Sequence, residues 1–277
     1  MTGHDMSNEP LIRFAFFAGV FVVIAAWEAM APRRDRQFPR RARWPANLGI
    51  VALNTALVRL LLPTTAVAFA LLGEQRGWGL LNTVDLPRWA AVILAVLALD
   101  LAIYLQHVVF HAVPVLWRLH RMHHADLDID VTTGARFHTI EILASMVLKL
   151  AGIAALGAPA IAVLAFEILL NATSMFNHAN IRLPAGFDRV LRWLVVTPDM
   201  HRVHHSIVRQ ETNSNFGFNL PWWDRLLGTY RAQPAAGHKA MTIGIEQFRS
   251  PGEQRLDRML TQPFRNDAAA TNRSALT

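Results

Sequence analysis

Long apolar runs constrain the fold of this chain more than any other feature of its sequence. Three runs are long and apolar enough to cross a bilayer, since a spanning α-helix needs about 20 apolar residues. These runs are residues 11–31, 48–73 and 89–113. Two shorter runs, residues 142–156 and 159–176, are separated by Gly157 and Pro159, which predict a tight turn. We therefore expect an all-α integral membrane bundle of three spans plus a helical hairpin.

A run of arginines after the first apolar run predicts how the chain crosses the membrane. Residues 33–43 hold six arginines, and loops rich in Lys and Arg stay in the cytoplasm. Counting the crossings from there places residues 114–141 and 179–277 on the cytoplasmic side, where we expect a helical cap. The expected location is the inner membrane of a bacterium. In a chain with membrane spans, positive loops report topology, which accounts for the net charge of +7. Because the sequence also has no nucleic-acid motif, we expect no nucleic-acid partner.

Ten of the twelve histidines lie between residues 107 and 205, in repeated spacings. An H-x3-H pattern begins at His107, and two H-x2-H-H patterns begin at His120 and His201. Because positions i, i+3 and i+4 share one face of a helix, we expect each H-x2-H-H to present three imidazoles to one point. Neutral imidazole binds Fe, Zn, Cu and Ni, so the sequence predicts a site for more than one ion. The candidate ligands are His107, His111, His120, His123, His124, His138, His178, His201, His204 and His205.

Three carboxylates are candidates to support these ligands rather than to bind metal. Asp100 shares a helical stripe with His107, and a charge within a span is costly and often functional. Asp100 supports a ligand or packs against a polar group of another helix, and the sequence favours neither reading. Glu141 follows His138, and Glu167 lies on a polar stripe of the second hairpin helix. No Ser or Cys nucleophile motif is visible, so no catalytic residue beyond the metal ligands is predicted.

Several chemistries fit an imidazole site at one face of a membrane. Iron would serve oxygen chemistry, and zinc would serve hydrolysis without oxidation. A metal transporter or a haem-binding electron carrier would also use histidine pairs, although a transporter would place them near the middle of the bilayer. The chain has no cysteine, which excludes thiolate zinc sites and cysteine-bound iron–sulfur clusters. A site beside apolar helices favours an enzyme that modifies lipids.

The three histidine patterns resemble the histidine boxes of the fatty acid hydroxylase/sterol desaturase superfamily of membrane di-iron enzymes. The sequences RFHTIE around His138 and NHAN around His178 are also similar, as are NSNFG and WWDRLLGTY after the last box, so the resemblance covers about residues 95–260. It implies two iron ions, with zinc as a replacement in purified material, that use O2 to hydroxylate or desaturate a lipid. It also implies that the ten candidate histidines bind the metal and that another group shapes the cap, namely Asn215, Trp222, Trp223 and Asp224. Fatty acyl, sterol-like and ether lipids all stay open as substrates.

The same resemblance sets the expected partners and the limits of the domain. Because the chain has no cysteine and no haem or flavin domain, electrons must come from a separate electron-donor protein. A basic cytoplasmic face would suit an acidic donor, although the topology bias explains that charge equally well. The other partners are a lipid from the bilayer and O2. We expect residues 1–264 to form one domain and residues 265–277 to be a disordered tail.

Overall fold

The computed structural model describes residues 8–62 and 64–266, and these residues form an all-helical protein. Its predicted apolar segments form five helical stretches that are long and apolar enough to cross a membrane. They are α1 (Glu9–Met30), α2 (Arg40–Leu61) continued by α3 (Ala66–Arg76), α4 (Arg88–Ala112), α6 (Thr139–Leu156) and α7 (Ala160–Asn177). The described residues contain two isolated β-bridges and no strand. Residues 267–277 of the predicted tail lie outside the described residues.

The second apolar run differs from its prediction, because residues 48–73 form parts of two helices instead of one segment. Leu62 follows α2 with an extended backbone, at φ −109° and ψ 121°. Pro63 comes next in the sequence, and the α region is disfavoured for a residue that precedes a proline. Thr65 then caps α3 by accepting a hydrogen bond from the amide of Ala68. The result is a separate helix of 11 residues.

α6 and α7 form the predicted hairpin. Each has 18 residues, which is about 27 Å of helix and close to the thickness of the hydrocarbon core. Gly157 ends α6 with a φ of 68°, in the left-handed region that glycine adopts without steric cost. A Cβ added to Gly157 would lie 2.3 Å from the carbonyl oxygen of Trp78. The turn therefore packs directly on the backbone that follows α3.

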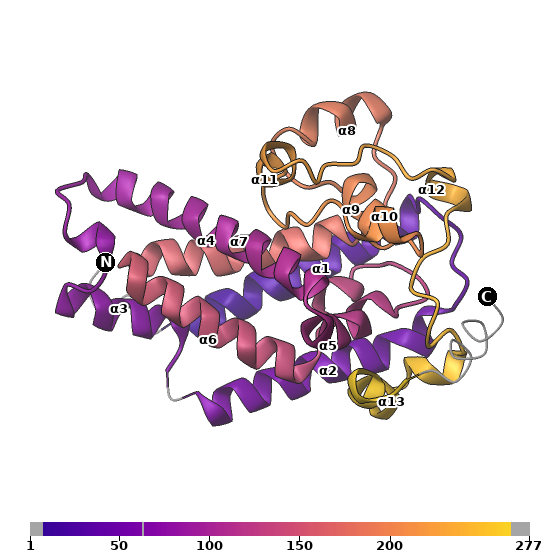
Figure 1. Ribbon diagram of the computed structural model, residues 1–277, viewed down its shortest axis with the longest axis horizontal. Helices are drawn as coiled ribbons and strands as arrows, with labels where there is room; N and C mark the ends of the chain where they lie inside the picture. The colour runs from indigo at the N-terminus through magenta and orange to yellow at the C-terminus, as the bar shows by residue number, and fades with distance from the viewer. Residues whose placement is uncertain (1–7, 63, 267–277) are drawn as a thin grey trace.

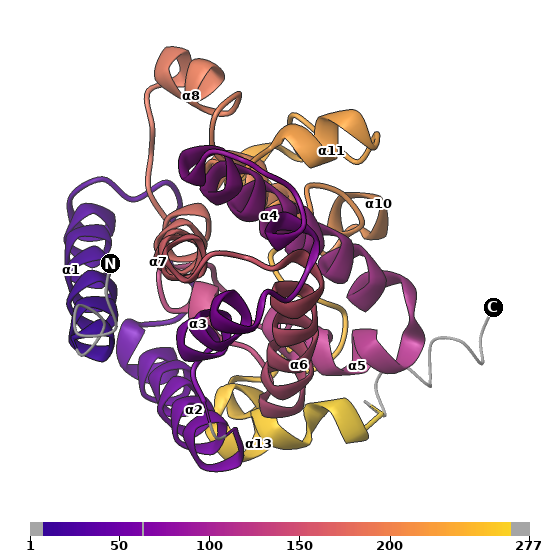
Figure 2. The same cartoon turned by 90° about the vertical axis from the view of Figure 1, so that its left-hand side faces the viewer.

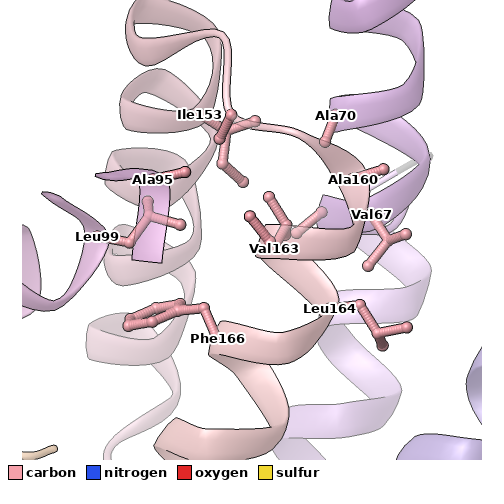
Figure 3. Close-up of a cluster of buried hydrophobic side chains, with 12 residues drawn as sticks. Val67, Ala70, Ala95, Leu99, Ile153, Ala160, Val163, Leu164 and Phe166 are labelled. Carbon is pink, nitrogen blue, oxygen red and sulfur yellow. The ribbon is translucent and has the colours of Figure 1, made fainter. Parts of the chain in front are cut away.

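Small side chains allow close packing where α3, α4, α6 and α7 meet (Figure 3). The core cluster includes Ala66, Val67 and Ala70 of α3, Ala95 and Leu99 of α4, Ile153 of α6, and Ala160, Val163, Leu164 and Phe166 of α7. Figure 2 shows α3 between α2, α6 and α7 when the bundle is seen along its length. Alanine at such positions lets helix backbones approach closely, which is how helices commonly associate in membranes.

The shorter helices gather where α4 ends (Figure 1). α5 (Pro114–His124) and α9 (Pro198–His204) carry the H-x2-H-H patterns, so both patterns lie on helices. Thr197 caps α9 by accepting a hydrogen bond from the amide of Met200. The other short elements at this end are η3 (Thr133–Ala135), α10 (Arg209–Thr212), α12 (Gly237–Ala240), η4 (Pro251–Gln254), α13 (Leu256–Thr261) and η5 (Gln262–Phe264). In contrast, η2 (Leu80–Asn82) lies at the opposite end, beside the turn after α6. α8 (Ala185–Leu191) and α11 (Trp222–Leu226) stand to one side of the bundle.

The arginine-rich segment between α1 and α2 is folded onto this end of the bundle. Arg33 forms an ion pair with Asp199 on α9, at 3.0 Å. Arg43, at the start of α2, pairs with Asp126 at 2.6 Å, and both side chains are fully buried. The segment therefore ties the first two helices to the residues around the histidines.

Candidate metal centre

Nine of the ten candidate histidines meet in two compact groups. Within each group the ligand nitrogens all lie within 4.8 Å of one another. The five-histidine group is His107, His111, His120, His124 and His204, and the four-histidine group is His123, His178, His201 and His205. The groups adjoin, since the rings of His124 and His205 stack with their centroids 4.6 Å apart. The geometry is that of two neighbouring sites lined by nitrogen.

Each H-x2-H-H pattern is divided between the two groups. His120 and His124 belong to the five-histidine group, whereas His123 belongs to the four-histidine group. The prediction that three imidazoles of one pattern meet at one point is therefore wrong. Successive residues on a helix are rotated by about 100°, so adjacent histidines diverge and enter different groups. In the second pattern, His204 and His205 diverge in the same way.

Hydrogen bonds at Nδ1 orient five of the rings. The accepting atoms are four backbone carbonyl oxygens and one carboxylate, and such oxygens only accept, so Nδ1 carries the proton and Nε2 carries a lone pair. The pairs are His107 with Phe216 (2.7 Å), His123 with Arg136 (3.1 Å), His178 with Ser174 (2.7 Å), His204 with Ser214 (2.8 Å), and His120 with Glu141 (2.6 Å). Partners of this kind fix the tautomer of a metal-binding histidine.

The lone pairs of these rings point at one another. Nε2 of His107 lies 3.0 Å from Nε2 of His120, and Nε2 of His178 lies 3.1 Å from Nε2 of His123. With both protons on Nδ1, neither contact is a hydrogen bond. Two nitrogens that each bind one ion at about 2.1 Å stand about 3 Å apart when the bonds meet at a right angle. Both contacts therefore fit ligands of a shared cation.

Other buried ring nitrogens have no hydrogen-bond partner among the described residues. They include both nitrogens of His124 and His205 and Nε2 of His111 and His204. A buried polar atom without a partner costs about 1–3 kcal/mol, and several together would be strongly unfavourable. A bound cation in each group would give each of these rings a partner at one nitrogen, so the residues present fit metal ions.

Four rings have a pKa well below the ordinary 6.5, namely those of His123, His124, His204 and His205. Burial is the largest cause, and the neighbouring imidazoles are the second. Burial also lowers the pKa of His178 to about 4. These rings are therefore neutral at pH 7. A metal ion binds neutral imidazole without having to displace a proton.

His138 lies outside both groups. Its Nδ1 accepts a hydrogen bond from the amide of Ile140, at 3.2 Å, so it caps α6. Its Nε2 donates to the carbonyl oxygen of Leu260, also at 3.2 Å. Because both ring nitrogens are engaged, the geometry gives His138 a structural place at the start of a helix and does not bring it to the metal groups.

Of the three candidate carboxylates, only Glu141 contacts the histidines. Asp100 instead accepts a hydrogen bond from the indole of Trp223, at 2.8 Å, which matches its reading as a packing partner of another segment. Glu167 forms a buried ion pair with Lys149, at 2.7 Å, and joins α6 to α7.

The sequence did not indicate the backbone carbonyls that orient the rings. Ser214 and Phe216 lie in a loop held by Asp224, which accepts hydrogen bonds from the amides of Phe216 (2.7 Å) and Gly217 (2.9 Å). Asn215 has a φ of 53°, a left-handed conformation that asparagine tolerates. The loop lies in NSNFG, and Asp224, which supports it, lies in WWDRLLGTY. The family resemblance therefore singled out both segments, but only the structure shows that the loop contacts the histidines.

Residues 92–229, about half of the chain, match the fatty acid hydroxylase family. An ornithine lipid hydroxylase of Rhizobium tropici is 34% identical over 53% of this chain and 44% of its own length. A human alkylglycerol monooxygenase is 29% identical over 56% of this chain and 34% of its own length. A rat cholesterol 25-hydroxylase is 25% identical over 59% of this chain and 53% of its own length. No solved structure matches.

The chain thus spans about half, or less, of the length of these relatives. The matched residues nevertheless include all nine histidines of the two groups. The five apolar helices and the family match together identify an integral membrane protein. Histidine spacing, geometry and similarity agree, and the chain belongs to the fatty acid hydroxylase family.

Proposed function

We propose that this protein is a membrane-bound, non-haem di-iron oxidoreductase that uses O2 to hydroxylate or desaturate a lipid. The observation that carries the proposal is the pair of buried imidazole groups, with nine ligand nitrogens for two neighbouring ions. The relatives add support, because those named above are hydroxylases or monooxygenases of lipids. Fatty acyl, sterol-like and ether lipids are the substrate classes.

The proposed arrangement in the membrane has three spans and a hairpin, with the histidines on the cytoplasmic face. The six arginines of residues 33–43 support this orientation by the positive-inside rule. α5, α9 and the segments around them form the cap over the histidines, and residues 1–264 act as one domain. The inner membrane of a bacterium is the proposed location.

In the proposed centre, the five-histidine group holds one iron ion and the four-histidine group holds the other. When bound, the ions supply activation of O2 and oxidation of an unactivated C–H bond. The chain contributes orientation, since the Nδ1 hydrogen bonds aim the lone pairs of five rings inward. It also contributes exclusion of water, because eight of the nine histidines are buried and His111 is partly buried.

Electrons for this reaction come, in the proposal, from a separate protein. The chain contains no cysteine, so it has no ligand for a ferredoxin-type iron–sulfur cluster. A donor protein is the remaining source, and lipid and O2 are the two substrates.

Metal analysis and lipid profiling test the proposal together. We expect two irons per purified chain and no Soret absorption band. Lipids from cells that express the protein should contain an oxidised product that is lost with His204→Ala. The matched control is His138→Asn, which changes a histidine outside both groups and keeps a residue suited to a helix cap.

The opposing results are equally specific. Stoichiometric zinc with no O2 consumption after reconstitution with iron would favour the non-oxidative zinc enzyme. A Soret band would indicate an electron carrier. An identical lipid profile for the native protein and His204→Ala would rule out lipid oxidation that depends on the histidines.

A further inference from the structure

α8 and α11 carry an apolar surface that faces away from the bundle. The α8–α11 platform is defined by six exposed large side chains, each between 54% and 74% exposed. They are Phe187, Val190, Trp193, Leu194, Leu226 and Leu227. Figures 1 and 2 show the two helices projecting to one side of the long helices. A patch of this kind on a protein surface marks an interaction site.

Hydrogen bonds and stacking make the platform one unit. The indole of Trp222 donates to the carbonyl oxygen of Trp193, at 2.8 Å, and so joins α11 to the end of α8. The guanidinium of Arg225 lies 3.7 Å from the ring centroid of Trp193 and 4.0 Å from that of Tyr230. The exposed apolar side chains are therefore held on a fixed base.

A contact with α4 sets the depth of the platform. The indole of Trp223, on α11, donates to Asp100 at 2.8 Å. Asp100 is the thirteenth residue of α4, which runs over Arg88–Ala112, so it lies roughly 18 Å along a helix that crosses about 30 Å of hydrocarbon. α11 is thus held beside the middle of α4, a helix that is long and apolar enough to cross a membrane. An exposed apolar face at that level suits lipid better than a soluble partner.

The other side of the platform is basic. A cleft of about 530 Å³ is lined by Arg33, Arg182, Arg189 and Arg192, together with Asp188 and Asp199. Both carboxylates already have partners, since Asp188 pairs with Arg192 and Asp199 pairs with Arg33. Arg182 and Arg189 are exposed, and neither has an ion-pair partner within residues 8–62 and 64–266. Their guanidinium groups can form the two-pronged hydrogen bonds that suit a phosphate.

We propose that the apolar side chains of the α8–α11 platform face the lipid, that the adjoining cleft lies at the headgroup level of the membrane, and that this cleft binds the phosphate of an anionic phospholipid. Tryptophan is enriched at this level of a bilayer, and interfacial helices combine an apolar face with arginine on the polar side. The platform shows the same combination, because exposed apolar side chains such as Trp193 accompany a cleft that Arg189 lines. The site is separate from the histidine groups and does not depend on which metal they hold.

Site-directed spin labelling tests the position of the platform. The chain has no cysteine, so Leu226→Cys and Val190→Cys each give one label site in the full protein in phospholipid nanodiscs. We expect both labels to collide more often with O2, which concentrates in lipid, than with a water-soluble nickel chelate. Lys239→Cys, exposed on α12, should show the reverse preference. Preference for the nickel chelate at residues 190 and 226 would overturn the proposal.

Ligand-dependent thermal stability tests the phosphate site. Short-chain phosphatidylglycerol, short-chain phosphatidylcholine and inorganic phosphate are each titrated into the purified protein. We expect phosphatidylglycerol to give the largest rise in Tm, with a half-saturating concentration at least about tenfold higher in the double variant Arg182→Gln/Arg189→Gln, a change of about 1.4 kcal/mol. The control is Arg209→Gln/Arg258→Gln, which removes the same charge from exposed positions elsewhere.

The outcomes separate the alternatives. An equal rise with inorganic phosphate would overturn the lipid site in favour of a simple anion site. An equal loss in the control pair would show a general charge effect and would also overturn it. Neither measurement uses enzymatic activity, so failure here is distinguishable from failure of the proposed oxidation.

Discussion

Among the residues that the structure describes, Glu141 is the one acidic side chain that orients a ring of the metal groups. It accepts the Nδ1 proton of His120 across 2.6 Å, and both residues are buried. Glu141→Gln replaces the carboxylate with a neutral and weaker acceptor of similar shape. We expect metal affinity to fall by about 10–100-fold while the protein still folds, which is the usual effect of losing such a partner. Metal bound per chain, measured over buffered free-metal concentrations, checks this.

The control for Glu141→Gln is Glu246→Gln, which makes the same chemical change at an exposed position. It should leave metal affinity unchanged. Equal affinities in the two variants would mean that His120 holds its orientation without the carboxylate.

Asp126 makes part of the stability of this protein dependent on pH. Burial would raise the pKa of Asp126, but Arg43 and Arg136 outweigh it and hold the pKa at about 2, against an ordinary 3.8. A carboxylate whose pKa is lower in the folded state stabilises that state fully at pH values above its unfolded pKa. This stabilisation is lost as the pH falls through the folded-state pKa. The difference is worth about 2 kcal/mol of unfolding free energy.

We therefore expect Tm in detergent to fall as the pH is lowered from about 4 towards 2. Asp126→Asn should lower Tm at neutral pH, because Arg43 loses a buried charged partner. It should also flatten the change in Tm over that acid range. A variant that keeps the full acid dependence of the native protein would assign that dependence to other carboxylates.

At the scale of elements, the α6–α7 hairpin depends on a glycine in its turn. Gly157 has a φ of 68° and would place a Cβ 2.3 Å from a backbone oxygen. Gly157→Ala therefore faces both backbone strain and a clash that no side-chain movement relieves. We expect a loss of several degrees in Tm, with the core of Figure 3 disturbed.

Gly152 supplies a matched control on the same helix. A Cβ there would meet nothing within 4 Å, and alanine is the better helix former. Gly152→Ala should keep or slightly raise Tm. If both variants behaved alike, the close approach at Gly157 would not be a determinant of the hairpin.

At the scale of the whole molecule, the metal groups join three regions of the chain that are distant in sequence. These are the consecutive helices α4 and α5, His178 after α7, and α9. Ligands that bind only the folded state stabilise it, by about 4 kcal/mol at 1,000 times the dissociation constant. Chelation should therefore lower Tm markedly, and added Fe²⁺ or Zn²⁺ should restore it while Mg²⁺ should not. An unchanged Tm after complete metal removal, measured by elemental analysis, would contradict this.

Much of the architecture was predictable because it depends on local patterns. Three long apolar runs and two shorter ones predicted where the helices of the bundle lie, and the glycine–proline signal predicted the hairpin. The break between α2 and α3 was missed, although Pro63 was visible in the sequence. Residues 48–73 are apolar on average, and this average concealed that a proline disfavours the helical conformation at the residue before it.

The sequence by itself determined the residue types of the site, ten clustered histidines, most of them in helical spacings, and no cysteine, because ligand chemistry is a property of side chains. Only the tertiary structure decided how those histidines are shared between two groups, since adjacent residues on one helix face different neighbours. It also decided that His138 caps a helix, that Asp100 binds Trp223, and that two backbone carbonyls orient His107 and His204. Backbone atoms are the same at every position, so only the path of the folded chain can assign them such a role.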